Sequence, residues 1–91
     1  MANIKSAAKR ARQALKRTER NRYYKTTART YIKRARAEID GSQLDEATET
    51  VRLASKALDK AAQKGVIHKN NAARRKSRLM KALHRAKTGD S

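Results

Sequence analysis

The chain contains no proline, and its three glycines stand far apart, at Gly41, Gly65 and Gly89. The segments between them are rich in Ala, Arg, Lys and Leu, which all favour helices. Glycine is preferred just after the last residue of a helix and costs about 1 kcal/mol inside one. The three glycines therefore predict three helix ends, and the sequence predicts an all-α fold.

Other residues predict how these helices begin and end. Ser42, with Asp45 three residues later, resembles a capping box, and Glu46 adds a second acid to the positive end of the middle helix. After Gly65, Val66 is expected to fold back over Ala61 in a Schellman-type contact. Asparagine is a preferred cap, so the predicted caps of the last helix are Asn70 or Asn71.

Apolar residues at alternating steps of three and four predict which faces of the helices are buried. Leu53 lies on the other side of the middle helix and is expected to be a single exposed leucine. The predicted buried face of the middle helix is Leu44, Ala47, Val51, Ala54 and Leu58, and that of the last helix is Ala72, Leu79, Leu83 and Ala86.

The first segment carries two apolar stripes that point in different directions. One runs from Ile4 to Leu15 and the other from Tyr24 to Ile39, rotated by about a third of a turn on a helical wheel. A helix over residues 5–40 would be about 50 Å long, whereas helices of about 20 residues span about 30 Å. We therefore expect one domain over residues 1–91, in which a basic arm, residues 1–20, extends helix one of a three-helix up-down-up bundle, residues 21–87.

Positive charge is concentrated in the outer segments of the chain. The formal net charge is +17 over 91 residues. Residues 1–38 and 60–91 hold nearly all the Lys and Arg, whereas residues 39–59 are net acidic. Such charge opposes compaction and favours a polyanionic partner, of which nucleic acid is the commonest.

The cations are also ordered in space. On the last helix, a basic ridge of Arg74, Arg78, Lys81 and Arg85 falls within about 60° and lies opposite the apolar face. No acid interrupts this ridge, and Asn70, Asn71 and Ser77 add neutral donors near it. In the arm, the cations expected to reach phosphates are Arg10, Arg12, Lys16, Arg17 and Arg20. Arg and Lys suit phosphate, so we predict binding to structured RNA by shape, with duplex DNA left open.

Several other functions lack their signatures. No cysteine is present, and His68 and His84 stand without neighbouring acids or thiols, so neither a metal site nor a catalytic base is recognisable. We expect no enzyme activity, no cofactor and no small-molecule substrate. The sequence shows no secretory signal and no apolar run of about 20 residues, which predicts a cytoplasmic protein. A nucleoid-type DNA-binding protein is the main alternative; a membrane-surface peptide is disfavoured by Ala-rich apolar faces without Trp or Phe.

Two stretches resemble a known family. "MANIKSAAKRARQ" with "KRTERNR", and above all "ALDKAAQKGVIHKNNAARRKSRLMKAL", are similar to the twentieth protein of the bacterial small ribosomal subunit. The resemblance implies direct binding to the 5′ domain and the penultimate stem of 16S ribosomal RNA during assembly, beside other small-subunit components. The RNA-contacting positions that it implies are Asn3, Lys5, Ser6, Lys9 and Arg10 in the arm, and His68, Lys69, Asn70, Arg74, Arg75, Lys76, Ser77 and Arg78 in the last helix.

Overall fold

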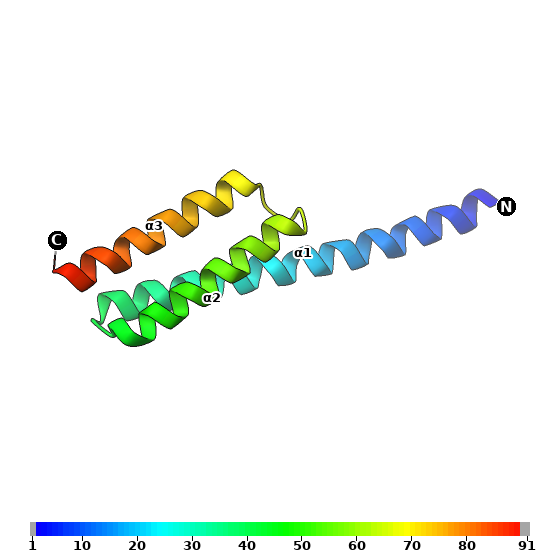
Figure 1. Cartoon of the computed structure of the whole chain (residues 1–91). Helices are drawn as coiled ribbons and strands as arrows, with labels where there is room; N and C mark the ends of the chain where they lie inside the picture. Colours follow the sequence, from blue (N-terminus) through cyan, green and yellow to red (C-terminus); the bar gives the residue numbers. More distant parts are fainter. Residues whose placement is uncertain (1, 90–91) are drawn as a thin grey trace.

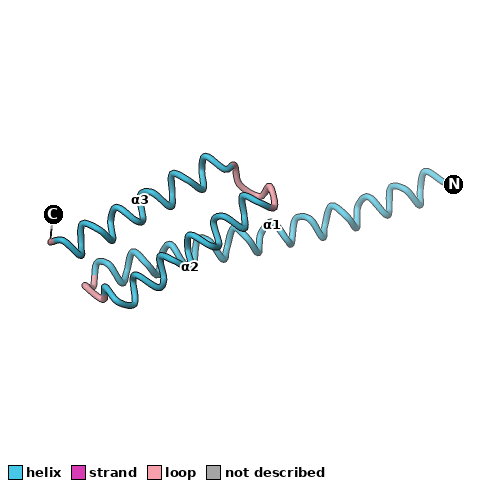
Figure 2. Tube along the Cα trace, viewed as in Figure 1, coloured by secondary structure: helices cyan, strands magenta, loops and turns pink. Residues whose placement is uncertain are grey.

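Three helices make up the fold, as the sequence predicts. The computed structural model describes residues 2–89, with side chains from residue 4 onward. The helices are α1 (Ala2–Asp40), α2 (Leu44–Gln63) and α3 (Lys69–Thr88), and no strand occurs in the described part. Figures 1 and 2 show α2 running antiparallel to α1, and α3 antiparallel to α2. The all-α, up-down-up arrangement with an extended first helix is thus confirmed.

The molecule is elongated because α1 is about twice as long as its partners. Its 39 residues compare with 20 in α2 and 20 in α3. The principal extents are 67 × 21 × 16 Å, and the N-terminal part of α1 projects beyond the bundle (Figure 1). At the opposite end α1 turns into α2, so only the C-terminal part of α1 is covered by other helices.

The core is thin and built largely from alanine. Leu58 and Leu79 are the largest side chains that are fully buried. The remaining buried apolar residues are Ala28, Ala35, Ala47, Val51, Ala54, Ala61, Ala72 and Leu83. Small side chains let the helix backbones approach closely, and the partly buried Tyr31, Ile32 and Ile39 of α1 pack against the edges of this core. These positions confirm the predicted apolar faces of α2 and α3.

The turn between α1 and α2 differs from the prediction. Ser42, not Gly41, adopts the left-handed conformation, with φ 60°. The Gln43 N–H donates to the Glu38 carbonyl at 2.8 Å and the Ser42 N–H to the Ile39 carbonyl at 3.1 Å, which is a complete Schellman motif. Ser42 is therefore part of the turn that ends α1. The predicted capping box is wrong, because the cap of α2 is Gln43, which makes no side-chain capping bond.

The second turn confirms one expectation and corrects another. Gly65 has φ 75°, and the Val66 N–H donates to the Ala61 carbonyl at 2.9 Å, as the predicted Schellman-type turn requires. The cap of α3, however, is His68, whose Nδ1 accepts a hydrogen bond from the Asn70 backbone N–H at 3.1 Å. Asn70 and Asn71 already lie inside the helix, so neither is its cap.

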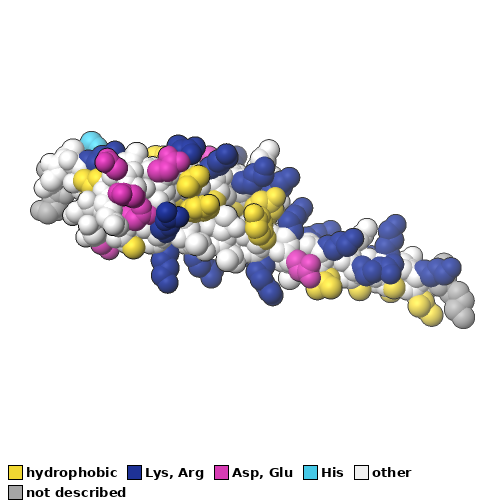
Figure 3. Space-filling view, turned by 90° about the horizontal axis from the view of Figure 1, so that it is seen from below, with side chains coloured by type: hydrophobic (Ala, Val, Ile, Leu, Met, Phe, Trp, Pro, Cys, Tyr) yellow, Lys and Arg dark blue, Asp and Glu magenta, His cyan; other side chains and the backbone are white. Residues whose placement is uncertain are grey.

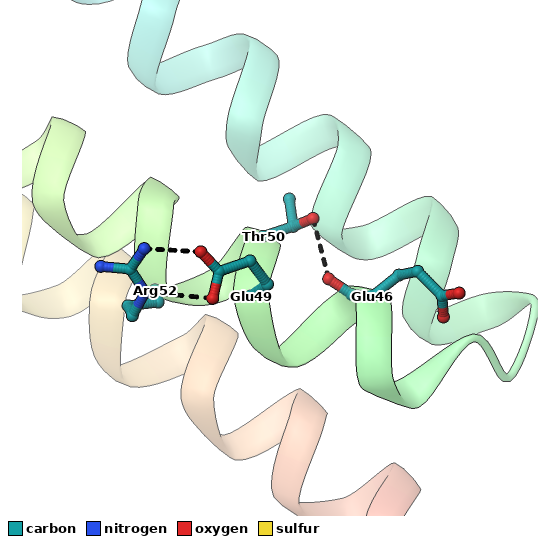
Figure 4. A network of polar contacts seen from close by, with 4 residues as sticks. All are labelled: Glu46, Glu49, Thr50 and Arg52. Carbon is teal, nitrogen blue, oxygen red and sulfur yellow. Dashed lines mark hydrogen bonds and ion pairs between the residues drawn. The ribbon is translucent and has the colours of Figure 1, made fainter.

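Buried polar contacts join α1 to α2 near their turn. The Thr50 hydroxyl lies 2.6 Å from Glu38 Oε1, and both residues are buried. Arg34 Nε lies 3.2 Å from the same carboxylate oxygen. Figure 4 shows that Thr50 also reaches back along α2 to the Glu46 carbonyl, at 3.0 Å. The carboxylate of Glu38 is thus paired inside the bundle and serves its structure.

Candidate nucleic-acid interface

The described part of the N-terminal arm, residues 4–20, has no tertiary partner. Every described side chain from residue 4 to 20 is exposed, including Ile4 at 68% and Leu15 at 60%. Figure 3 shows Lys and Arg side chains along one edge of this arm and hydrophobic side chains along the other. The basic face consists of Lys5, Lys9, Arg12, Lys16 and Arg20, which fall within about 80° on a helical wheel. Arg10 and Arg17 flank this face, and all seven cations are exposed.

The predicted ridge on α3 is likewise turned to solvent. Arg74, Arg78, Lys81 and Arg85 are all exposed, whereas Ala72, Leu79 and Leu83 on the opposite side are buried. Among the residues that the structure describes, the ion pairs are Arg34–Glu38, Arg52–Glu49 and Lys76–Asp59. None of them includes a cation of the arm or of the ridge. These charges are therefore free to bind an external anion.

The structure places the remaining predicted contact residues in several different settings. His68 caps α3 through Nδ1, so its ring proton lies on Nε2, where it can be donated to a ligand. Lys69, Asn70 and Ser77 are exposed, as is Ser6 in the arm. Asn3 is also a predicted contact, but the structure does not describe its side chain. These residues stay predicted RNA contacts.

Two of the predicted cations on α3 make contacts within the protein. Lys76 Nζ lies 2.9 Å from Asp59 Oδ1 and 3.1 Å from Oδ2, so it joins α3 to α2. Arg75 Nε donates to Asn71 Oδ1 at 2.6 Å, one helical turn away. The Lys76 ammonium is thus partly neutralised, whereas the Arg75 contact is to a neutral group and holds its guanidinium in place.

A recess between α1 and α3 brings in cations that sequence reasoning missed. It has a volume of about 370 Å³, and Lys25 and Arg29 of α1 face Asn71 and Arg75 of α3 across it. Leu58, Ala61 and Ile67 line its apolar part. The signal in the sequence was the i, i+4 spacing of Lys25 and Arg29 beside the buried Ala28, but the partner helix was needed to recognise a site.

The arm and α3 are brought together at one end of the bundle. Figure 1 shows that α3 begins at the end from which the arm projects. The cations of the recess come from α1 just after the arm and from the first turns of α3. The arm, the recess and the start of the ridge therefore share one end of the bundle, but on a helical wheel Lys25 and Arg29 fall on the side of α1 opposite the basic face of the arm.

The acids of α2 lie in separate settings on the helix. Asp45 and Glu46 lie in the first turn of α2, and Asp59 is paired with Lys76. A hydrogen bond from Arg52 lowers the pKa of Glu49, with Nε to Oε2 at 3.1 Å (Figure 4). In the described residues no cluster of His, Cys, Asp or Glu could hold a metal ion. No helix of this part of the chain is long and apolar enough to span a membrane.

The fold and its surface define a class: a small, highly basic helical protein whose exposed cations are gathered on the arm and on one face of α3. Comparison with known proteins identifies the family. The family model for ribosomal protein S20 matches residues 2–84. The small ribosomal subunit protein bS20 of Coprothermobacter proteolyticus is 51% identical over 84 residues, covering 92% of this chain and 96% of the relative.

Two other relatives of the same name agree with this match. The protein of Thermomicrobium roseum is 52% identical over 92% of this chain and 85% of its own length. That of Geobacillus thermodenitrificans is 51% identical over 92% of this chain and 94% of its own length. The chain therefore belongs to the ribosomal protein S20 family, which is a family of structural ribosomal proteins and not of enzymes.

Proposed function

We propose that this protein is a structural component of the bacterial small ribosomal subunit that binds 16S ribosomal RNA directly and helps it to fold during assembly. Membership of the S20 family supports the place in the ribosome, and with it a cytoplasmic location. The observation that carries direct binding is the set of unpaired cations on the arm and on α3, with the arm projecting from the end of the bundle at which α3 begins.

The geometry suggests how the two parts divide the task. The bundle, residues 21–87, fixes the ridge and the recess on a rigid scaffold. The arm, residues 1–20, offers cations on one face and small Ala side chains on the other, so its backbone can approach RNA closely. A projecting arm and a compact bundle suit two separate RNA elements, which we take to be the 5′ domain and the penultimate stem. Other small-subunit components are then neighbours on the same RNA.

The phosphate contacts make a quantitative prediction. We expect about 8 contacts between Lys or Arg side chains and RNA phosphates, so the logarithm of the binding constant should fall by about 6 to 7 for each tenfold rise in salt concentration. Replacing Arg74, Arg78, Lys81 or Arg85 singly by Ala should reduce that slope by about one unit. Lys87→Ala is the matched control, since Lys87 is an exposed cation of α3 outside the ridge.

The decisive experiment is a salt titration of binding to a 16S 5′-domain transcript beside a duplex DNA of equal length. Steep salt dependence together with preference for the transcript supports the proposal. A slope shallower than about −3 would mean that the ridge and arm do not track phosphates. Equal affinity for both nucleic acids at physiological salt would favour the nucleoid-type alternative.

A further inference from the structure

A second kind of surface lies where the arm joins the bundle. Tyr23, Tyr24, Thr27 and Tyr31 of α1 form a groove with residues of α2, with a volume of about 380 Å³. The α2 side consists of Leu53, Lys56, Ala57 and Lys60. Leu53, expected to be exposed, is half-buried there. All three tyrosines of the chain line this groove, and none of its lining residues is acidic.

Tyr23 is the one tyrosine of the groove that is exposed, because Tyr24 and Tyr31 are half-buried. It is 65% exposed, although a tyrosine that served the core would be covered. Its ring meets the half-buried Tyr24 ring edge to face, with centroids 5.4 Å apart and planes at 73°. This contact orients Tyr23 without covering it, which leaves an aromatic surface available for stacking.

Tyr23 also lines a second hollow on α1, which differs from the groove in the charge of its lining residues. That hollow is lined by Glu19, Arg22 and three threonines together with Tyr31. It contains an acid, whereas the groove toward α2 presents Lys56 and Lys60 at i, i+4 spacing. Charge complementarity therefore favours an anionic ligand on the α2 side.

The groove continues the basic face of the arm. On the helical wheel, Tyr23 and Thr27 lie within the same arc of about 80° as Lys5, Lys9, Arg12, Lys16 and Arg20. A phosphate backbone bound along the basic face of the arm would therefore reach the tyrosines of the groove. Figure 3 shows hydrophobic side chains gathered where the arm meets the bundle, with Lys and Arg side chains beside them.

We propose that this groove receives one unpaired base of the bound RNA, stacked on Tyr23, while Arg20, Lys56 and Lys60 hold the phosphates on either side. Every base has an aromatic face, so stacking on an exposed tyrosine needs no particular base, and flanking cations supply the contacts to the backbone. This proposal rests on the proposed function. To the recognition of RNA shape it adds one contact with a single-stranded nucleotide.

The test uses the full chain and two variants, Tyr23→Ala and Tyr23→Phe. Each is titrated with the 16S 5′-domain transcript and with a fully paired RNA duplex of equal length. Tyr23→Ala should weaken transcript binding by about 5- to 150-fold, the usual cost of losing one stacked base. The salt slope should stay unchanged, because an aromatic ring releases no counterion. Tyr23→Phe should bind like the wild type, and neither variant should alter binding to the duplex.

Tyrosine fluorescence gives an independent reading of the same groove, because no tryptophan is present and all three tyrosines line it. Transcript binding should quench this fluorescence, and the quenching should be smaller with the duplex. Unchanged transcript affinity in Tyr23→Ala, at the normal salt slope, would overturn the stacked base and leave the proposed function intact. Failure of the wild type to bind the transcript at all would instead overturn the proposed function.

Discussion

The two halves of α1 share one backbone and similar composition, yet they have different environments. In residues 4–20 every side chain is exposed, whereas Ala28, Ala35 and Glu38 of the second half are buried. Both halves are rich in Ala, Arg and Lys, so helix propensity does not separate them. What separates them is the presence of α2 and α3 beside the second half. The comparison teaches that the same helix contributes to the core in one half and leaves its side chains exposed in the other, where we propose that they bind RNA.

Deleting residues 2–20 should have the largest effect on RNA binding and little effect on folding. The five cations of the arm's basic face are lost, so the salt slope should become shallower by about 3.5 to 4.5 units. Of the described arm residues, 4–20, none belongs to the core, so the melting transition should persist. Salt titrations and thermal melts of the truncated and full chains measure both effects. Global unfolding of the truncated protein would contradict the separation of the two halves.

Replacing a leucine by alanine should lower the stability of the protein in the bundle but not in the arm. Leu58→Ala and Leu79→Ala remove side chains that are 1% and 0% exposed. Each should cost about 2 to 5 kcal/mol, which can exhaust the stability of so small a domain. Leu15→Ala in the arm is the control, since Leu15 is 60% exposed and should leave the melt unchanged. Equal destabilisation by Leu15→Ala and Leu58→Ala, in melts of all three variants, would show that the arm is packed.

Glu38→Ala should have an intermediate effect, confined to the bundle. The change removes the acceptor of the Thr50 hydroxyl, 2.6 Å away, and the partner of Arg34. Thr50 keeps its bond to the Glu46 carbonyl and Arg34 is exposed, so we expect a loss of about 1 to 2 kcal/mol. Denaturant unfolding measures this loss, with Glu19→Ala in the arm as the control. A loss from Glu19→Ala as large as that from Glu38→Ala would refute the structural role given to Glu38.

The smallest expected effect is the pH dependence of the Glu49–Arg52 pair on the surface of α2. The hydrogen bond from Arg52 lowers the pKa of Glu49 below its ordinary value of about 4.3. Any stabilisation by the pair is therefore present above that pH and is lost as pH falls through the lowered pKa. The stability difference between wild type and Glu49→Gln should be slight at pH 7 and vanish in acid. A stability difference that grows as the pH falls would contradict the lowered pKa of Glu49.

The sequence predicted the helices and their faces well because these follow from local rules. Gly41, Gly65 and Gly89 mark the helix ends to within a few residues, and apolar spacing identifies the buried sides of α2 and α3. The caps were predicted less well. The left-handed residue after α1 is Ser42, and His68 rather than an asparagine caps α3, because backbone conformation in a short turn decides which side chain can cap.

The candidate site was predicted in part for a similar reason. The basic ridge and the arm each lie on one helix, so a helical wheel was sufficient to find them. The recess of Lys25, Arg29 and Arg75 joins α1 to α3, and the tyrosine groove joins α1 to α2. The ion pair of Lys76 with Asp59 also crosses between helices. Contacts of this kind depend on how the helices pack, which the spacing along one helix does not reveal.

Amide hydrogen exchange of the full chain, free and bound to the 16S transcript, tests the central comparison most directly. The arm carries like charges and has no tertiary partner, and an isolated helix of its length is marginal in water. Residues 4–20 should therefore exchange almost freely in the free protein and become protected on RNA, while residues 28–62 stay protected in both states. Strong protection of the arm without RNA, or no gain of protection on binding, would contradict the account.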